Sequence, residues 1–316
     1  MKAIILTRQG GVENLLISEI EQPQPQPTEV VVKVHAISIN PVDIKTRKGG
    51  ALYASMKDDP PVILGWDISG VITKVGDEVK SFKEGDAVFG MVNFPGHGKA
   101  YAGYVAAPAD HFALKPENIS HPEAAAATLA ALTAWQVLVH EAKVNKGQHL
   151  LMHAAAGGVG HFAVQIAKHL GMTVSGTASA ANEAYLKEIG VNHFIDYTSQ
   201  NFEEAAKDFD VVFDPIGGET TARSLQVLKH GGTLISVVGG VKDHLAPTIQ
   251  EKGIKAKNYL VHSSGDDMQE LAQLLQQGIL KPYVSHQFSF EEMAKAHQQI
   301  ETGKTRGKVV VNLITE

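Results

Sequence analysis

Three glycines stand close together near the middle of the chain, at a spacing that suits the binding of a phosphate group. Residues 149–152 predict a short strand and residues 162–167 an apolar helix, and the sequence A-A-G-G-V-G at 155–160 joins them. Backbone amides and the positive dipole end at the start of a helix attract a pyrophosphate, and glycine lets the backbone approach it. We expect a dinucleotide to be held here by Ala156, Gly157, Gly158, Val159 and Gly160. Because Ala155 replaces the first glycine of the usual G-x-G-x-x-G pattern, a plain strand-to-helix turn is the alternative.

The residues after the next strand bear on which dinucleotide is bound. A carboxylate at that strand end accepts hydrogen bonds from a ribose diol and repels a 2′-phosphate, but residues 177–181 contain no acid. Ser179 and Tyr197 could contact a 2′-phosphate, so NADPH is favoured over NADH. Both hydroxyls fit ordinary loop positions as well, and the nearest base, Lys187, lies on the following helix.

The loop belongs to a repeating pattern of short apolar runs and amphipathic helices. Such a pattern predicts a doubly wound parallel sheet covered on both faces. The expected strands are 149–152, 172–177, 193–197, 210–214, 233–238 and 257–262, and the expected helices are 162–167, 183–189 and 219–228, the last closed by Gly231-Gly232. This α/β pattern is that of a Rossmann nucleotide-binding domain.

The first third of the chain has a different pattern. Residues 29–36 and 70–76 predict strands, and frequent glycine and proline with little helix favour a small β-barrel. Near the end, helices are expected at 268–277 and 290–302 and a strand at 307–313. Since a terminal apolar strand needs a sheet to pair with, we expect it to return to the first domain. The predicted domains are 1–123 with 265–316, and 124–264.

Composition excludes several classes of protein. The net charge of −6 and the lack of a basic run in the sequence disfavour nucleic acid or an anionic membrane as the main partner. The chain contains no cysteine, which excludes disulfides and thiolate chemistry. No apolar run is long enough to span a bilayer or to resemble a signal peptide, and we expect a cytoplasmic protein.

The order of the short motifs resembles the medium-chain dehydrogenase/reductase family, in its zinc-free branch of quinone oxidoreductases and 2-alkenal (enone) reductases. The resemblance rests on the segments 38–45, 65–72, 85–90, 124–134, 154–160 and 307–310 and covers nearly the whole chain. It implies a GroES-like substrate domain, a Rossmann domain, NADPH, and a homodimer. The activity it implies is hydride transfer to a quinone or an α,β-unsaturated carbonyl.

Zinc-dependent members of the family bind the catalytic metal through a thiolate and the histidine of a Gly-His-Glu motif. This sequence has no thiolate and reads Gly65-Trp66-Asp67 at the motif. Since Zn²⁺ prefers sets of cysteine and histidine ligands, we expect no metal.

By resemblance, the site near the nicotinamide includes Asn40, Asp43, Tyr53 and Asp67 as catalytic candidates. Each also has a structural interpretation: Asp43 could cap a helical turn, Asp67 could be half of a buried ion pair, and Tyr53 could be a surface residue. The remaining candidates for binding the cofactor are Asn40, Thr133, Val238, Gly239 and Ser263.

Two other functions fit the same pattern. One is a zinc-free reductase of enoyl thioesters or other carbonyls. The other is a cofactor-binding protein with a non-catalytic role associated with RNA or a membrane.

Overall fold

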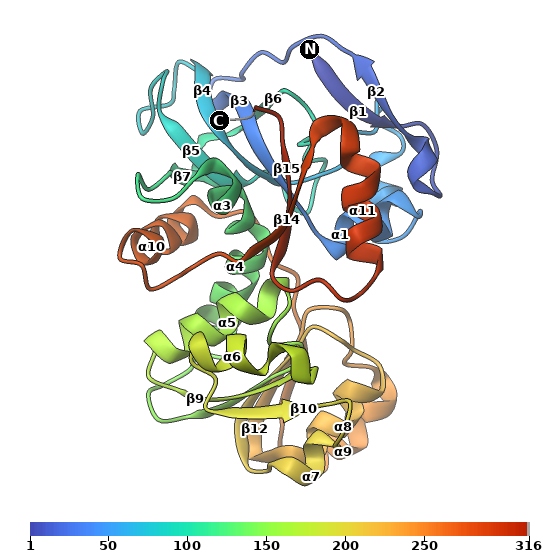
Figure 1. Cartoon of the computed structure of the whole chain (residues 1–316), viewed down its shortest axis with the longest axis vertical. Helices are drawn as coiled ribbons and strands as arrows, with labels where there is room; N and C mark the ends of the chain where they lie inside the picture. Colours follow the sequence, from blue (N-terminus) through green and yellow to red (C-terminus); the bar gives the residue numbers. More distant parts are fainter. Residues whose placement is uncertain (315–316) are drawn as a thin grey trace. The chain divides into compact units, whose positions relative to one another are not determined.

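The computed structural model describes residues 1–314 and divides into two compact units (Figure 1). Unit 1 contains Met1–Leu132 and His262–Glu316, and unit 2 contains Thr133–Val261. Helix α3 (His121–Ala126), which spans the expected boundary at 123, packs on strands of unit 1. No described helix is long and apolar enough to cross a membrane.

Unit 1 is built on a seven-stranded sheet in the order β14-β15-β3-β4-β5-β7, with β6 also pairing with β3. Its strands are β3 (Glu29–Ile39), β4 (Asp67–Val75), β5 (Ala87–Met91), β6 (Tyr104–Pro108), β7 (Phe112–Leu114), β14 (Val284–Ser289) and β15 (Lys308–Asn312). The C-terminal strand β15 returns to this unit as predicted, but it lies inside the sheet, parallel to β14 and antiparallel to β3. A separate hairpin pairs β1 (Lys2–Leu6) with β2 (Leu15–Glu19).

The helices of unit 1 lie in the chain segments that connect its strands. They are α1 (Pro41–Arg47), α2 (Tyr53–Met56), α3, α10 (Gly265–Gln276) and α11 (Met293–Glu301), and α4 (Leu129–Trp135) carries the chain into unit 2. Asn40 and Asp43 form a capping box that starts α1. The expected helix at 290–302 begins as a 3₁₀ turn, Phe290–Glu292, and becomes α11 only at Met293.

Unit 2 is a six-stranded, fully parallel sheet in the order β10-β9-β8-β11-β12-β13. Its strands are β8 (His149–Met152), β9 (Thr173–Ala178), β10 (His193–Asp196), β11 (Phe209–Asp214), β12 (Leu228–Ser236) and β13 (Lys255–Asn258). Its helices are α5 (Gly158–His169), α6 (Glu183–Glu188), α7 (Phe202–Ala205), α8 (Glu219–Val227) and α9 (Ala246–Glu251), with a π-helical turn at Gln136–Glu141. The strand order reverses between β8 and β11, which is where doubly wound folds bind ligands.

Two expectations for unit 2 were wrong in detail. The sixth strand is β13, which ends at Asn258, whereas the sequence suggested 257–262. Gly231-Gly232 does not close α8, which ends at Val227; the glycines lie within β12, where the pairing register with β11 shifts. Gly231 has a φ of +76°, a conformation that favours glycine. The strand irregularity therefore requires the glycine that the sequence had suggested as a helix end.

Candidate functional site

The glycine loop connects β8 to α5 in unit 2, as the sequence predicted. Gly157 precedes α5 in an extended conformation and supplies no side chain to cap the helix, so the first amides of α5 receive no cap from it. A Cβ at position 160 would lie 2.2 Å from the carbonyl oxygen of Ala154, so only glycine fits there. An uncapped helix start reached by a close-packed glycine turn fits the pyrophosphate of a dinucleotide.

The departure from the glycine pattern at Ala155 is accommodated by the neighbouring strand. Ala155 is fully buried, and a Cβ at Gly176 of β9 would lie 2.9 Å from its methyl carbon. A glycine in β9 therefore makes the room that the missing loop glycine would otherwise provide.

The end of β9 carries the residues that we associated with a 2′-phosphate. Ser179 precedes a 3₁₀ turn, and its hydroxyl accepts a hydrogen bond of 3.1 Å from Asn182. Tyr197, after β10, is 62 % exposed. Lys187 does not supply a free charge, because its ammonium group lies 2.6 Å from the carboxylate of Glu183. The side chains at this rim are thus mainly neutral donors and acceptors.

Sequence reasoning missed a carboxylate beside this rim. Asp196 ends β10 directly opposite Ala178 in the parallel register. Its carboxylate accepts hydrogen bonds from the amide and hydroxyl of Thr198 and from the hydroxyl of Ser199, and the bonds from Thr198 hold the pKa of Asp196 below its usual range. Its position near the end of the predicted third strand, 193–197, was the available signal.

Exposed apolar side chains follow three neighbouring strands at the same edge of the sheet. Ile216, Val238 and Leu260 come shortly after β11, β12 and β13 and are 52 %, 39 % and 57 % exposed. Gly239 follows Val238 with a φ of +74°. Large apolar groups left open at the carboxyl edge of a parallel sheet suit the flat ring of a ligand.

Two other cofactor candidates are engaged within the protein. Thr133 is buried in α4, and the hydroxyl of Ser263 accepts a hydrogen bond of 2.9 Å from the amide of Phe94. Ser263 therefore anchors the loop at 93–99, which is also held by a 2.8 Å bond from the indole of Trp66 to the carbonyl of Gly96.

Unit 1 brings together three of the four catalytic candidates in a buried polar cluster. Asn40 lies at its centre: its Nδ2 donates to Asp67 over 2.7 Å, and its Oδ1 accepts from the ammonium group of Lys308. Lys308 and Asp67 are themselves 3.9 Å apart, and all three residues are buried. The Asn40 amide thus bridges a buried ion pair, and Lys308 is a member that sequence reasoning missed.

Asp43 joins the same cluster through Asn40 and Tyr101. Its carboxylate accepts a hydrogen bond of 2.8 Å from the backbone amide of Asn40 and one of 2.9 Å from the hydroxyl of Tyr101. The Tyr101 hydroxyl also lies 2.9 Å from Nε2 of His297. Burial, reinforced by the charge of Asp67, raises the pKa of Asp43 to about 7. The capping interpretation of Asp43 and the ion-pair interpretation of Asp67 both match this geometry.

Tyr53 stands apart from the cluster. It begins the short helix α2, is partly exposed, and its hydroxyl has no hydrogen-bond partner among residues 1–314. No hydrogen bond of the described residues links it to Asn40, Asp43 or Asp67.

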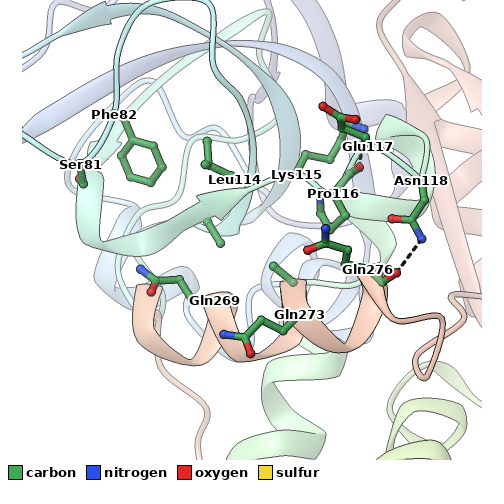
Figure 2. Close-up of a pocket in the computed structure, with 12 residues that line it drawn as sticks. Ser81, Phe82, Leu114, Lys115, Pro116, Glu117, Asn118, Gln269, Gln273 and Gln276 are labelled. Carbon is green, nitrogen blue, oxygen red and sulfur yellow. Dashed lines mark hydrogen bonds between the residues drawn. The ribbon is translucent and has the colours of Figure 1, made fainter.

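A cavity of about 730 Å³ in unit 1 lies elsewhere, between α10 and residues 113–118 (Figure 2). Gln269, Gln273 and Gln276 line one side, and Asn118 donates a 3.1 Å bond to the carbonyl of Leu275. The ammonium group of Lys115 is used on backbone carbonyls, and the carboxylate of Glu117 is the acidic group among the lining residues. Within the described part of the chain, no group of three or more histidine, cysteine, aspartate or glutamate side chains could hold a metal ion.

A doubly wound nucleotide-binding unit combined with a β-sheet unit that the C-terminal strand completes defines the class of two-domain dehydrogenases. Residues 26–117 match the model of the alcohol dehydrogenase GroES-like domain, and residues 189–311 match that of the zinc-binding dehydrogenases. The chain belongs to the medium-chain dehydrogenase/reductase family and is an NAD(P)H-dependent oxidoreductase.

Similar proteins share nearly the full length of the chain. A 2-methylene-furan-3-one reductase from Solanum lycopersicum is 36 % identical over 99 % of this chain and 79 % of its own length. A chloroplastic NADPH-dependent alkenal/one oxidoreductase from Arabidopsis thaliana is 35 % identical over 98 % of this chain and 79 % of its own. The structure of the quinone oxidoreductase from Coxiella burnetii superposes with a TM-score of 0.93 and 35 % identity over 99 % of both chains.

Proposed function

We propose that the protein is a zinc-independent reductase that uses NADPH to reduce quinones or α,β-unsaturated carbonyls. The observation that carries the proposal is the uncapped start of α5, reached by a glycine turn where the strand order reverses. The similar proteins named for enone, alkenal and quinone reduction support this choice of substrate. When bound, the dinucleotide supplies the hydride, so the protein's task is to bind, orient and stabilise.

The residues of unit 2 hold the cofactor. The amide of Ala156 and those of residues 158–160 receive the pyrophosphate, while the amide of Gly157 holds the turn through the carbonyl of Ala154. Ser179 and Tyr197 receive the adenosine end with its 2′-phosphate. The exposed side chain of Val238 and the backbone at Gly239 face the nicotinamide end. The absence of an acid at the end of β9 supports NADPH over NADH.

The residues of unit 1 act in two ways. Asn40, Asp43 and Asp67 are buried, and both carboxylates accept hydrogen bonds from Asn40. We therefore assign these residues to holding the start of α1 and the side chain of Asn40 rather than to transferring a proton to the substrate. Tyr53 is the candidate that can donate a proton to a reduced carbonyl oxygen, because its hydroxyl is uncommitted and partly exposed.

Zinc independence rests on the residues at the metal-binding motif of the family. Trp66 is fully buried and Asp67 is hydrogen-bonded to Asn40, so neither presents a free ligand. By resemblance to the family, we also expect a homodimer, which sedimentation equilibrium would detect at twice the 33.8 kDa chain mass. The composition of the sequence favours a cytoplasmic location.

The test is turnover of a panel of quinones, 2-alkenals and enoyl thioesters with NADPH, before and after dialysis against a chelator. We expect reduction of quinones or alkenals that survives chelation, with metal content well below one atom per chain. Preference for enoyl thioesters would reassign the substrate, and NADPH binding without turnover of any acceptor would contradict an enzymatic role. A Tyr53→Phe variant tests the proposed proton donor. The substitution should lower kcat for alkenals more than kcat for quinones.

A further inference from the structure

His153 immediately follows β8 and directly precedes Ala154, where the turn into the glycine loop begins. It is buried, and both ring nitrogens meet hydroxyl groups of other elements: Nδ1 lies 3.2 Å from Thr177 at the end of β9, and Nε2 lies 2.9 Å from Ser224 in α8. Its backbone amide donates to the carbonyl of Phe213 in β11 over 3.2 Å. His153, which continues from β8, is thus hydrogen-bonded to β9, β11 and α8.

The hydrogen bonds of this group can be directed without conflict. Ser224 donates its only hydroxyl hydrogen to the carbonyl of Thr220 over 2.6 Å, so it accepts from Nε2–H of His153. Nδ1 then carries a lone pair and accepts the hydroxyl hydrogen of Thr177. The ring is neutral in this arrangement, and burial keeps it so by lowering the pKa of His153 to about 4.

Thr177 in turn holds the turn that begins the glycine loop. Its hydroxyl oxygen accepts from the amide of Ala154 over 3.2 Å, and its carbonyl accepts from the amide of Ala155 over 2.9 Å. Ala154 has a φ of +48°, in the left-handed region that a residue with a Cβ adopts only when its surroundings impose it. The carbonyl of Ala154 then accepts the amide of Gly157 over 2.8 Å, just before α5.

We propose that His153 is a positioning residue for the dinucleotide: as a neutral strut between Thr177 and Ser224, it fixes the left-handed turn at Ala154 and thereby the direction of the amides that start α5. The proposal rests on the proposed function in one respect, which is that a pyrophosphate accepts hydrogen bonds from those amides. His153 itself does not contact the cofactor.

The chain offers a matched control at the other end of the same strand. His149 begins β8, and its Nε2 lies 2.9 Å from the hydroxyl of Ser175 in β9. Its ring packs on Phe209 with the ring centres 4.5 Å apart. His149 thus shares the residue type, the strands and the kind of contact with His153, but it lies at the amino end of β8, away from the loop.

The experiment compares His153→Phe, Ser224→Ala and His149→Phe with the wild type by titration with NADPH and with 2′-AMP, which lacks the pyrophosphate. We expect the Kd for NADPH to rise about tenfold in His153→Phe and several-fold in Ser224→Ala, with the Kd for 2′-AMP unchanged. His153→Gln, whose amide can meet both hydroxyls, should restore most of the affinity. An equal loss for 2′-AMP, an equal loss in His149→Phe, or no loss in either loop-side variant overturns the proposal.

Amide hydrogen exchange of the ligand-free protein separates this proposal from the proposed function. His153→Phe should speed exchange at residues 154–157, while His149→Phe leaves their exchange at the wild-type rate. Unchanged exchange in His153→Phe overturns the strut. Failure of the wild type to bind NADPH counts against the proposed function instead, and the exchange result still decides the role of His153.

Discussion

At the scale of single residues, the proposed preference for NADPH directs attention to two side chains of opposite character, Ser179 and Asp196. Ser179 presents a neutral hydroxyl after β9, while Asp196 presents a carboxylate after β10 that is already engaged with Thr198 and Ser199. Because the acid is engaged in its own turn, we infer that the hydroxyl sets the preference.

We therefore expect Ser179→Asp to shift the preference from NADPH toward NADH. A carboxylate there repels a 2′-phosphate and accepts hydrogen bonds from a ribose diol, and the ratio of kcat/KM for the two cofactors should change by at least about tenfold. Steady-state kinetics with both cofactors measures it. Gln226→Glu adds the same charge at an exposed position of α8 and should leave the ratio unchanged; a ratio unaltered in Ser179→Asp would remove Ser179 from the cofactor site.

The candidate residues differ in how far the sequence could place them. The glycine loop was predictable because its glycine spacing between a short apolar strand and a helix can be read within a dozen residues, although its contacts with Thr177 of β9 could not. Lys308 and His297 were not, because their partners Asn40 and Tyr101 are 268 and 196 residues away in the chain. Only the pairing of distant strands and helices brings them together.

At the scale of elements, β15 connects the buried polar cluster to the sheet. Val309 pairs with Ile39, so Lys308 is placed next to Asn40 at the start of α1. Burial lowers the pKa of Lys308, and the charge of Asp67 opposes that effect. The strand therefore contributes a buried cation as well as backbone hydrogen bonds.

Lys308→Met should destabilise unit 1 strongly. It leaves the carboxylate of Asp67 buried without its cation, which costs about 3–5 kcal/mol in comparable cases, measurable by urea unfolding. The double variant Lys308→Met with Asp67→Asn removes both charges and should recover much of the loss. Lys295→Met breaks only an exposed pair with Glu292 and serves as the control. No recovery in the double variant would mean that Lys308 acts by packing alone.

The elements themselves were predicted best where a short apolar pattern lay between clear turn residues or needed a sheet to pair with. The strand and helix of the loop and the return of the terminal strand follow from local pattern and from the need to pair a sheet edge. The pattern failed at Gly231-Gly232, because a glycine that permits a strand irregularity looks the same in the sequence as one that ends a helix. It also placed β13 too late, since Tyr259 and Leu260 are apolar without being part of the strand.

At the scale of the whole molecule, buried titratable groups in both units make stability depend on pH. Burial lowers the pKa of His153 in unit 2 to about 4 and those of His121 and His297 in unit 1 to about 4 and about 3. The unfolded chain binds these protons near pH 6.5, so the histidines reduce stability as pH falls from there toward 4. Asp43 acts oppositely: its folded pKa of about 7 exceeds the ordinary 3.8, so its contribution is present at low pH and is lost as pH rises toward 7.

Asp43→Asn should therefore make the protein more sensitive to acid. The variant lacks the proton uptake that stabilises the folded state between pH 7 and 4, so its free energy of unfolding should fall more steeply over that range than that of the wild type. Urea unfolding at pH 7, 5.5 and 4.5 measures the slope. Asp77→Asn, at a turn before β5, is the control; an equal or shallower slope in Asp43→Asn would show that Asp43 does not titrate there.

The interior position of β15 also constrains how the polypeptide matures on the ribosome. Strand β3 emerges early, yet one of its neighbours in the sheet consists of residues 308–312. The parallel sheet of unit 2 is complete in the nascent chain well before those residues are translated. Synthesis thus delivers all strands of the nucleotide-binding unit while β3 still lacks the neighbour that completes its sheet, and during that interval its edge is open to pairing with other chains.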